Sequence, residues 1–244
     1  MTQNIPLGVF AAAGLGGGAA VPAYVQNLVQ TNGTKFYTGN TGFSSGYPSR
    51  PFLEASAWIS LDNTSHEQML FAWGLDTFLR VNTSGYLDLK IEDDANATVW
   101  DFTANTRQLS LDTLYHVYMS FDLANGVGVL LLDGASVTGT GSPSSSSQDI
   151  QMNKVFDIFD QIFGGSPKFE GQIGDLWVDN PASLSGYAAF HEGGSPVDLA
   201  ALAASTLPGI YMGGTMEASD WNANTNLGSI TLTGAGTGTF TDVT

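Results

Sequence analysis

Carboxylate side chains are the residues of this chain that come nearest to a catalytic arrangement. A retaining glycosidase needs two carboxyl groups about 5 Å apart, and one strand supplies such a pair when both residues lie on the same face. Glu92, Asp93 and Asp94 are consecutive, so neighbours among them would point to opposite faces of a strand. Glu170 and Asp175 are separated by an odd number of positions, and an unbulged strand would also place them on opposite faces. We therefore interpret residues 92–94 as a solvated acidic turn and expect no hydrolase of this kind.

Other catalytic or metal-binding patterns are missing from the sequence. The three histidines, His66, His116 and His191, lie far apart, and none has the spacing of a metal-ligand pair. No cysteine occurs, which excludes thiolate ligands and disulfides. The glycine-rich run at 14–18 lacks the lysine of a phosphate-binding loop, and no Gly-x-Ser-x-Gly sequence is present. The sequence therefore predicts a protein that is not an enzyme and needs no cofactor, with one exception considered below.

Three aromatic residues are candidates for ligand binding. Trp58, Tyr118 and Trp177 each lie opposite the apolar residues of a strand-like segment. Sugar rings stack on exposed aromatic side chains, while their hydroxyl groups bond to amides and carboxylates. If the three residues share an open sheet face, we expect them to contact sugar. If a loop or the C-terminal segment covers that face, they are ordinary buried packing, and the sequence leaves both alternatives open.

Strands must position these residues, because apolar side chains recur at every second position. The clearest case is residues 115–122, where the odd positions are apolar. Asn125-Gly126 suits a type I′ turn into a second strand at 127–132, which ends at Asp133-Gly134. Further strands are predicted at 52–62, 68–74, 78–82, 86–92, 98–102, 108–111 and 169–180. Short strands without long amphipathic helices predict an all-β, antiparallel β-sandwich of the jelly-roll type.

The two ends of the chain differ from this central part. Residues 1–23 are rich in Gly and Ala and lack the basic start of a signal peptide, so we expect a flexible N-terminal arm. Residues 24–190 form the predicted sandwich, and the serine-rich stretch 138–148 is predicted to be a surface loop. In the segment 191–244 we expect a short helix from Pro196 to Ala204 and late strands at 210–212, 229–233 and 237–240. Those strands either return to the main sheets or form a small separate element.

The central strands also carry a family resemblance. The order of a strand that contains Tyr-His-Val and Ser-Phe-Asp, a hairpin and a long Gly-x-Ile-x-Asp-Leu strand resembles the laminin-G-like members of the concanavalin A-like lectin/glucanase superfamily, from about Lys35 to Asn180. The residues that carry it are Tyr115, His116, Val117, Phe121, Asp122, Leu130, Asp133, Gly134, Phe169, Gly171, Ile173, Asp175, Leu176, Val178 and Asn180. The glucanase signature Glu-x-Asp-x-x-Glu is absent. Because laminin-G-like domains often hold a calcium ion, the resemblance implies Asp93, Asp122 and Asp175 as candidate ligands for Ca²⁺.

Charge and composition narrow the choice of partners. The formal net charge of -16 would repel nucleic acid and anionic membrane surfaces. The uncharged Gly/Ala arm resembles the opening of many tailed-phage virion proteins. We therefore expect a non-enzymatic structural protein of a bacteriophage virion, as a capsid decoration or tail-fibre component, with other virion proteins, copies of itself and host-surface glycans as partners. The alternative is a secreted or cell-surface carbohydrate-binding module, and a more distant one is a glycoside hydrolase.

Overall fold

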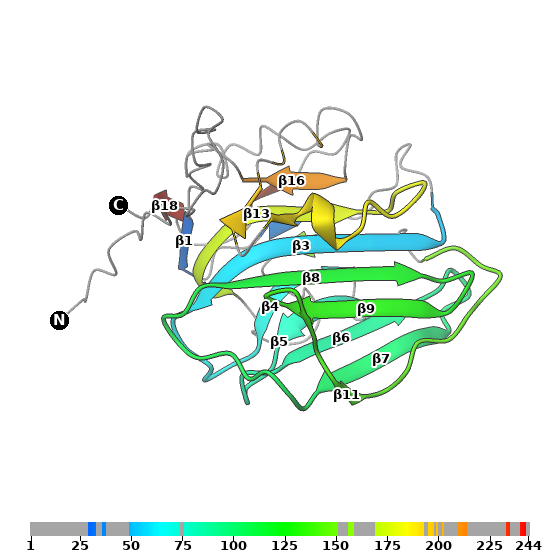
Figure 1. The fold of residues 1–244 in the computed structure, drawn as a ribbon, viewed down its shortest axis with the longest axis horizontal. Coiled ribbons are helices and arrows are strands. Elements are labelled where there is room, and N and C mark those ends of the chain that lie inside the picture. The colour runs from blue at the N-terminus through cyan, green and yellow to red at the C-terminus, as the bar shows by residue number, and fades with distance from the viewer. Residues whose placement is uncertain are drawn as a thin grey trace, which may run out of the picture.

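The chain folds into two antiparallel β-sheets that face each other. The computed structural model describes residues 29–32, 36–37, 49–73, 76–150, 156–158, 169–192, 195–197, 199, 202, 209–213, 233–234 and 240–242. Figure 1 shows the two layers, with β3, β8 and β13 in one and β4 to β7 in the other. Each sheet has 8 strands. The predicted all-β sandwich is confirmed.

The first layer, sheet A, is built around three long strands. Its order is β10-β9-β8-β3-β13-β1-β18, and β16 pairs with another part of β13. The strand bounds are β1 (Val29–Asn32), β3 (Phe52–Leu61), β8 (Tyr115–Asp122), β9 (Val127–Leu132), β10 (Ala135–Ser136), β13 (Glu170–Asp179), β16 (Ile210–Met212) and β18 (Phe240–Asp242). β3 is central and lies between β8 and β13.

The second layer, sheet B, has the order β11-β7-β6-β5-β4-β12-β2-β17. Its strands are β2 (Phe36–Tyr37), β4 (Gln68–Trp73), β5 (Thr77–Val81), β6 (Leu87–Glu92), β7 (Thr98–Ala104), β11 (Gly139–Thr140), β12 (Phe156–Ile158) and β17 (Thr233–Gly234). A small third pairing joins β14 (His191–Glu192) to β15 (Ser195–Pro196). The one described 3-10 helix is η1 (Tyr187–Ala189).

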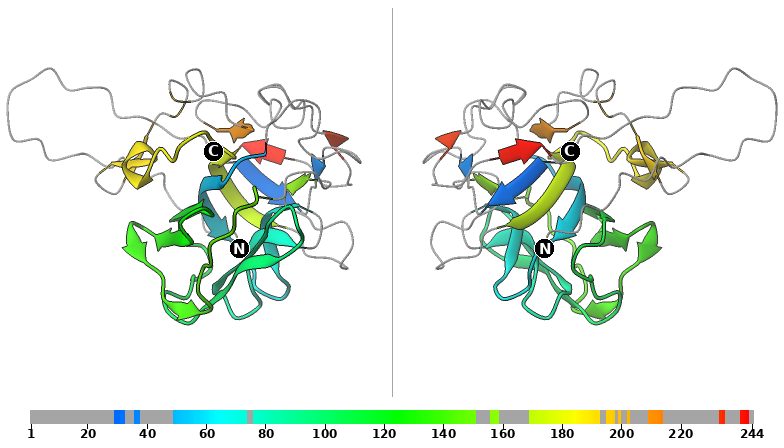
Figure 2. Two further views of the ribbon diagram at one scale, coloured as in Figure 1. Left: turned by 90° about the vertical axis from the view of Figure 1, so that its right-hand side faces the viewer. Right: turned by 90° about the vertical axis from the view of Figure 1, so that its left-hand side faces the viewer.

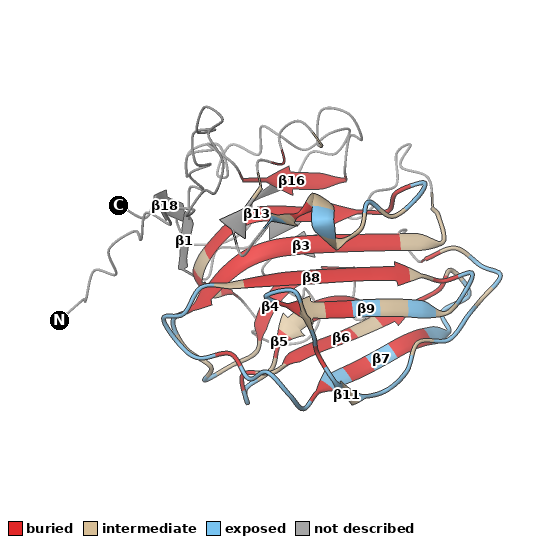
Figure 3. Cartoon of the chain, viewed as in Figure 1, coloured by how far each residue is buried: buried red, intermediate tan, exposed pale blue. Residues whose placement is uncertain are grey.

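The core lies between the two sheets and follows the period of two. Val117, Met119 and Phe121 on β8 are buried with the odd-numbered residues of β3, which confirms the apolar face predicted for both strands. Sheet B adds its own inward residues, such as Leu79 and Leu89. Figure 3 shows that burial is nearly continuous along β3, β8 and β13. Burial of both faces of these strands means that something also covers the outer side of sheet A.

The local sequence indicated one of the two hairpin turns correctly and the other incorrectly. Asp133 and Gly134 both have positive φ, at 50° and 74°, and they join β9 to β10 as a two-residue type I′ turn. The type I′ prediction for Asn125-Gly126 is wrong, because only Gly126 has positive φ and the loop from β8 to β9 contains four residues. Its geometry is set by Asp122, whose carboxylate accepts the backbone N–H of Asn125 at 3.1 Å.

The late strands return to the main sheets. β16 pairs with β13 and β18 with β1, while β17 pairs with β2 in the other sheet. Figure 2 shows the red C-terminal strands beside the blue N-terminal ones. Pro196 lies in β15, so the predicted helix does not begin there; Leu202 has helical backbone, and most of the remaining helix prediction lies outside the described residues. The N-terminal arm also lies outside them.

The predicted strand at 108–111 is wrong. Arg107 and Asp112 have positive φ, at 59° and 54°, so the chain turns at both ends of this segment. Leu111 forms a single bridge to Leu61. Within the part of the chain that the structure describes, no helix is long and apolar enough to cross a membrane.

Candidate functional site

The three aromatic residues predicted to bind a ligand do share one face, the outer side of sheet A, but other residues cover that face. Trp58 is 6% exposed, Tyr118 2% and Trp177 0%. Stacking on a sugar ring needs an open aromatic face, which none of them offers. Of the two alternatives left open by the sequence, buried packing is the one that this structure shows, and the prediction of sugar contact is corrected for all three.

The cover is a short segment after β13, residues 185–192, which we call the strap. It contains η1 and β14, and Figure 1 shows η1 lying across the outer side of sheet A near β13 and β3. Phe190 of the strap packs 5.4 Å from the ring of Trp177 and 5.5 Å from that of Tyr118, measured between centroids. Leu199 and Tyr211 complete this second apolar cluster.

A buried carboxylate fastens the strap to the sheet. Glu54, on β3, is fully buried. Its carboxylate accepts hydrogen bonds from the hydroxyl of Tyr118 at 2.8 Å and from the backbone N–H groups of Ser185 at 3.1 Å and Gly186 at 3.0 Å. Burial, together with the charge of Glu54, raises the pKa of Tyr118. The three donors explain how a carboxyl group can be buried at this position.

The three aspartates implied as calcium ligands do not form a site. Asp93 accepts the N–H groups of Ala95 and Ala97 with one oxygen and the hydroxyl of Ser146 with the other. Asp122 shapes the β8–β9 loop, as described above. Asp175 lies in the middle of sheet A, at a bulge of β13, with φ of 46°. Among the described residues, no three His, Cys, Asp or Glu side chains form a group that could hold a metal ion.

The acidic turn at 92–94 also differs from its prediction. Glu92 and Asp93 are 6% and 3% exposed, so this is not a solvated turn. Glu92 lies 3.0 Å from Lys90 as an ion pair, and the bonds of Asp93 close the turn to β7. Burial acts to lower the pKa of Lys90, but the hydrogen bond and charge of Glu92, with those of Asp76, raise it overall. These carboxylates therefore have structural partners.

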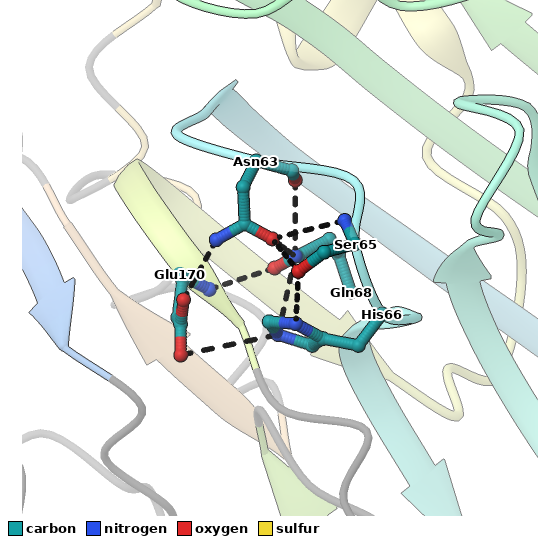
Figure 4. Close-up of polar contacts among 5 residues, drawn as sticks. All are labelled: Asn63, Ser65, His66, Gln68 and Glu170. Atoms are coloured by element: carbon teal, nitrogen blue, oxygen red, sulfur yellow. Dashed lines mark hydrogen bonds and ion pairs between the residues drawn. The ribbon is translucent and has the colours of Figure 1, made fainter.

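A polar network at one end of the sandwich is the candidate site. It joins the loop between β3 and β4 to the start of β13, and it consists of Asn63, Ser65, His66, Gln68 and Glu170 (Figure 4), which we call the polar rim. The amide of Asn63 donates to the carboxylate of Glu170 at 2.7 Å, and the backbone N–H of Glu170 donates to the side-chain oxygen of Gln68 at 2.7 Å. The imidazole Nε2 of His66 lies 4.0 Å from Glu170 Oε1. All but Gln68 are at least partly exposed.

The loop is ordered by its own side chains. The side-chain oxygen of Asn63 accepts the backbone N–H of Ser65 at 3.2 Å and its hydroxyl at 3.1 Å. The side-chain amide of Gln68 donates to the backbone oxygen of Asn63 at 3.1 Å. These contacts hold the amide groups of Asn63 and Gln68 and the hydroxyl of Ser65 in place, and such ordering would reduce the entropy cost of binding a ligand.

The polar rim continues onto the outer face of sheet B. Glu67, between His66 and Gln68, pairs with Arg80 at 2.7 Å. Two nitrogens of Arg80 reach the same oxygen of Asp88, Oδ2: Nε at 2.8 Å and Nη2 at 2.7 Å. Thr103 donates to Asp88 at 3.0 Å. Arg80 and Glu67 are partly exposed, whereas Asp88 is buried. The guanidinium of Arg80 lies 4.5 Å from the ring centroid of Phe78.

The rim has groups that can bond to hydroxyls. The hydroxyl of Ser65 donates to Asn63 at 3.1 Å and also contacts Nδ1 of His66 at 3.3 Å. The arrangement can hold hydroxyl groups through planar amide, carboxylate and guanidinium side chains.

Sequence reasoning missed this site because its two halves are far apart in the chain. Asn63 and Glu170 are separated by 107 positions. From the sequence, Glu170 was a candidate only as a catalytic carboxylate, and His66 only as a catalytic or metal-binding histidine. The local signal was the Asn-x-Ser turn at 63–65, where a side chain bonds to its own backbone two residues on. Sequence reasoning also missed the contact of His116 with His191, whose rings lie 5.2 Å apart.

Comparisons with known structures agree with the fold. A putative carbohydrate binding protein from Bacteroides ovatus ATCC 8483 matches with a TM-score of 0.57 and 17% identity, over 91% of this chain and 61% of that one. A heptameric SAP-like pentraxin from Limulus polyphemus matches at 0.46 and 16%, over 65% and 78% of the two chains. Mouse laminin alpha1 domains LG4-5 match at 0.46 and 16%, over 64% and 41%. No protein-family model and no curated protein matches the sequence. The fold is therefore a lectin-like β-sandwich.

Proposed function

We propose that this chain is a non-enzymatic glycan-binding protein and that its ligand binds at the polar rim. The observation that carries the proposal is the hydrogen-bonded set of amide, imidazole and carboxylate groups joining Asn63 to Glu170 at a partly exposed end of the sandwich. The fold match to a putative carbohydrate binding protein supports the same class of function. Sugar hydroxyls both donate and accept, which suits such a mixed set.

The ligand is a neutral glycan or one with few negative charges. The rim and its continuation on sheet B contain Glu67, Asp88 and Glu170, and the cation Arg80 already pairs with two of these. The chain as a whole carries a formal net charge of -16. An anionic glycan would meet net repulsion at long range and at the site.

A glycan array followed by calorimetric titration tests this proposal. We expect at least one glycan to bind, and Asn63→Ala to weaken it about tenfold or more, because the substitution removes two ordered groups of the rim. Asn125→Ala is the matched control, since Asn125 lies in the β8–β9 loop at the opposite end of β3. A flat array, or equal losses in the two variants, would overturn the proposal.

The second part of the proposal concerns the setting. We infer that the sandwich is displayed on a bacteriophage virion, with copies of itself and other virion proteins as partners. The support comes from the cysteine-free acidic composition and the uncharged Gly/Ala-rich residues 1–23. Deletion of residues 1–18 should abolish incorporation into particles and leave glycan affinity unchanged. Normal incorporation of the shortened chain would contradict this part alone.

A further inference from the structure

The imidazole of His116 is a fully enclosed titratable group of sheet A. The residue is fully buried, and its Nε2 contacts the hydroxyl of Ser56 at 2.8 Å. Its other ring nitrogen, Nδ1, has no hydrogen-bond partner within the described residues. A second proton on this ring would create a buried charge whose N–H lacks an acceptor, which is costly.

This imidazole belongs to a column of rings, two from sheet A followed by two from the strap. The ring of His116 stacks on Trp58 of the sheet at 4.8 Å and on His191 of the strap at 5.2 Å. His191 in turn stacks on Tyr187, also from the strap, at 4.9 Å. The strap is therefore closed by contacts between neutral rings, in addition to the Glu54 bonds and the packing of Phe190.

The charged groups around the column do not compensate a proton on His116. Asp133, in the β9–β10 turn, bonds to the backbone N–H of His116 at 2.8 Å and acts to raise the pKa of His191. Burial outweighs this effect, and the pKa of His191 is lowered overall. Burial, followed by the neighbouring His191, lowers the pKa of His116 to about 3.

The other groups that face the column are already engaged or neutral. Glu54 on β3 is used by Tyr118 and by the strap N–H groups. Tyr118 and Tyr187 have raised pKa values because of burial, so both are neutral at acidic pH. Glu192 follows His191 in β14 and is exposed.

We propose that residues 185–192 are an acid-responsive strap: at neutral pH the stacked His116 and His191 hold it closed over sheet A, and their protonation releases it. Release removes Phe190, His191 and Tyr187 from the rings of Trp58, Tyr118 and Trp177, and so uncovers the part of the aromatic face that Leu199 and Tyr211 do not cover. The device goes beyond glycan binding at the polar rim, which lies elsewhere on the molecule and does not depend on it.

The direction follows from linkage. Both histidines have lower pKa values when the strap is closed than in a solvated open state, where the ordinary value is about 6.5. The closed state is therefore fully stabilised above about pH 6.5 and progressively lost as the pH falls toward 3. For His116 alone, with values of about 3 and about 6.5, the open-to-closed ratio rises about 25-fold between pH 7 and pH 5.

Hydrogen exchange of the full chain measures this opening directly. Backbone N–H groups of Ser185, Gly186, Ala189 and Phe190 are hydrogen-bonded in the closed strap. We expect their protection, corrected for the intrinsic pH dependence of exchange, to fall about 25-fold or more from pH 7 to pH 5. Amides of β3 and β8 should stay protected, which separates strap opening from global unfolding.

Variants of the three histidines supply matched tests. His116→Gln together with His191→Gln should remove the pH dependence of strap exchange, whereas His66→Gln, at the polar rim, should leave it as in the wild type. Strap protection that is flat with pH in the wild type, or equally steep in the double variant, would overturn the proposal.

A nuclear magnetic resonance titration of the unmodified protein keeps the test valid if the double variant does not fold. The ring of His116 should remain neutral at pH 5 in the closed protein, with a second, strap-open signal growing as the pH falls. Titration of this ring near pH 6.5 without any change at the strap would refute the device.

Discussion

The outer faces of the two sheets differ in the side chains that they carry and in how far water reaches them. Sheet A turns aromatic rings outward and hides them beneath the strap, where three donors bond to the buried carboxylate of Glu54. Sheet B turns ion pairs outward, centred on Arg80 and Lys90, and leaves them partly in water. Covered polar groups are costly to disturb, whereas solvated ones are cheap to rearrange. The aromatic face therefore contributes stability. The outer side of sheet B combines partly exposed ion pairs with a smaller buried cluster of Met69, Ala72 and Phe78.

The largest difference between the faces should appear on removing an aromatic ring. Trp177→Ala deletes a fully buried side chain and should lower the free energy of unfolding by about 3–5 kcal/mol. Thr103→Ala, on the exposed outer side of sheet B, should lower it by about 0.5 kcal/mol. Urea denaturation measures both, and a loss for Trp177→Ala as small as that for Thr103→Ala would show that the strap does not enclose the ring.

The next effect concerns pH. Because burial holds the pKa of His116 at about 3 in the folded protein, its contribution to stability is complete above about pH 6.5 and lost as the pH falls. Between pH 7 and pH 5 this amounts to about 2 kcal/mol. The difference in unfolding free energy between wild type and His116→Gln should shrink by that amount over the interval. A difference that stays constant from pH 7 to pH 5 would show that His116 is not held neutral by the fold.

A smaller contrast is expected between two glutamates. Glu54→Gln keeps the shape of the side chain but removes one acceptor oxygen, so at least one of its donors loses its partner, at a cost of about 1–2 kcal/mol. Glu67→Gln weakens an ion pair whose side chains are 36% and 20% exposed, at a cost below about 1 kcal/mol. Denaturation of the two variants in parallel checks the order, and a reversed order would contradict the comparison of the faces.

Much of the fold could be predicted because its signals are local. The alternation at Tyr115–Asp122 gave β8 with its observed bounds, and the same pattern predicted β3 to within one residue. The Asp133-Gly134 pair marked a tight turn by residue type alone. The strand prediction at 108–111 was wrong because the backbone of this segment bonds to distant parts of the chain: the N–H of Leu109 donates to the oxygen of Gly85, and the N–H of Asp112 to that of Leu61.

The candidate site was beyond such reasoning, because it depends on contacts between distant segments. The face of Trp58, Tyr118 and Trp177 was identified, but its cover comes from residues 185–192, whose sequence has no strong period. The bulge at Asp175 changes the register of β13 between Gly174 and Trp177. The sequence pattern of this strand did not indicate a bulge. The approach of Asn63 to Glu170 follows only from the pairing of β3 with β13.

Mapping of a bound glycan by nuclear magnetic resonance tests the central claim most directly. The protein is titrated at neutral pH with a glycan that binds on the array, and backbone amide shifts are followed. The account predicts changes at residues 63–68 and at Glu170, with none at the strap or at Trp177. Changes confined to the outer face of sheet A, with the polar rim unaffected, would contradict it.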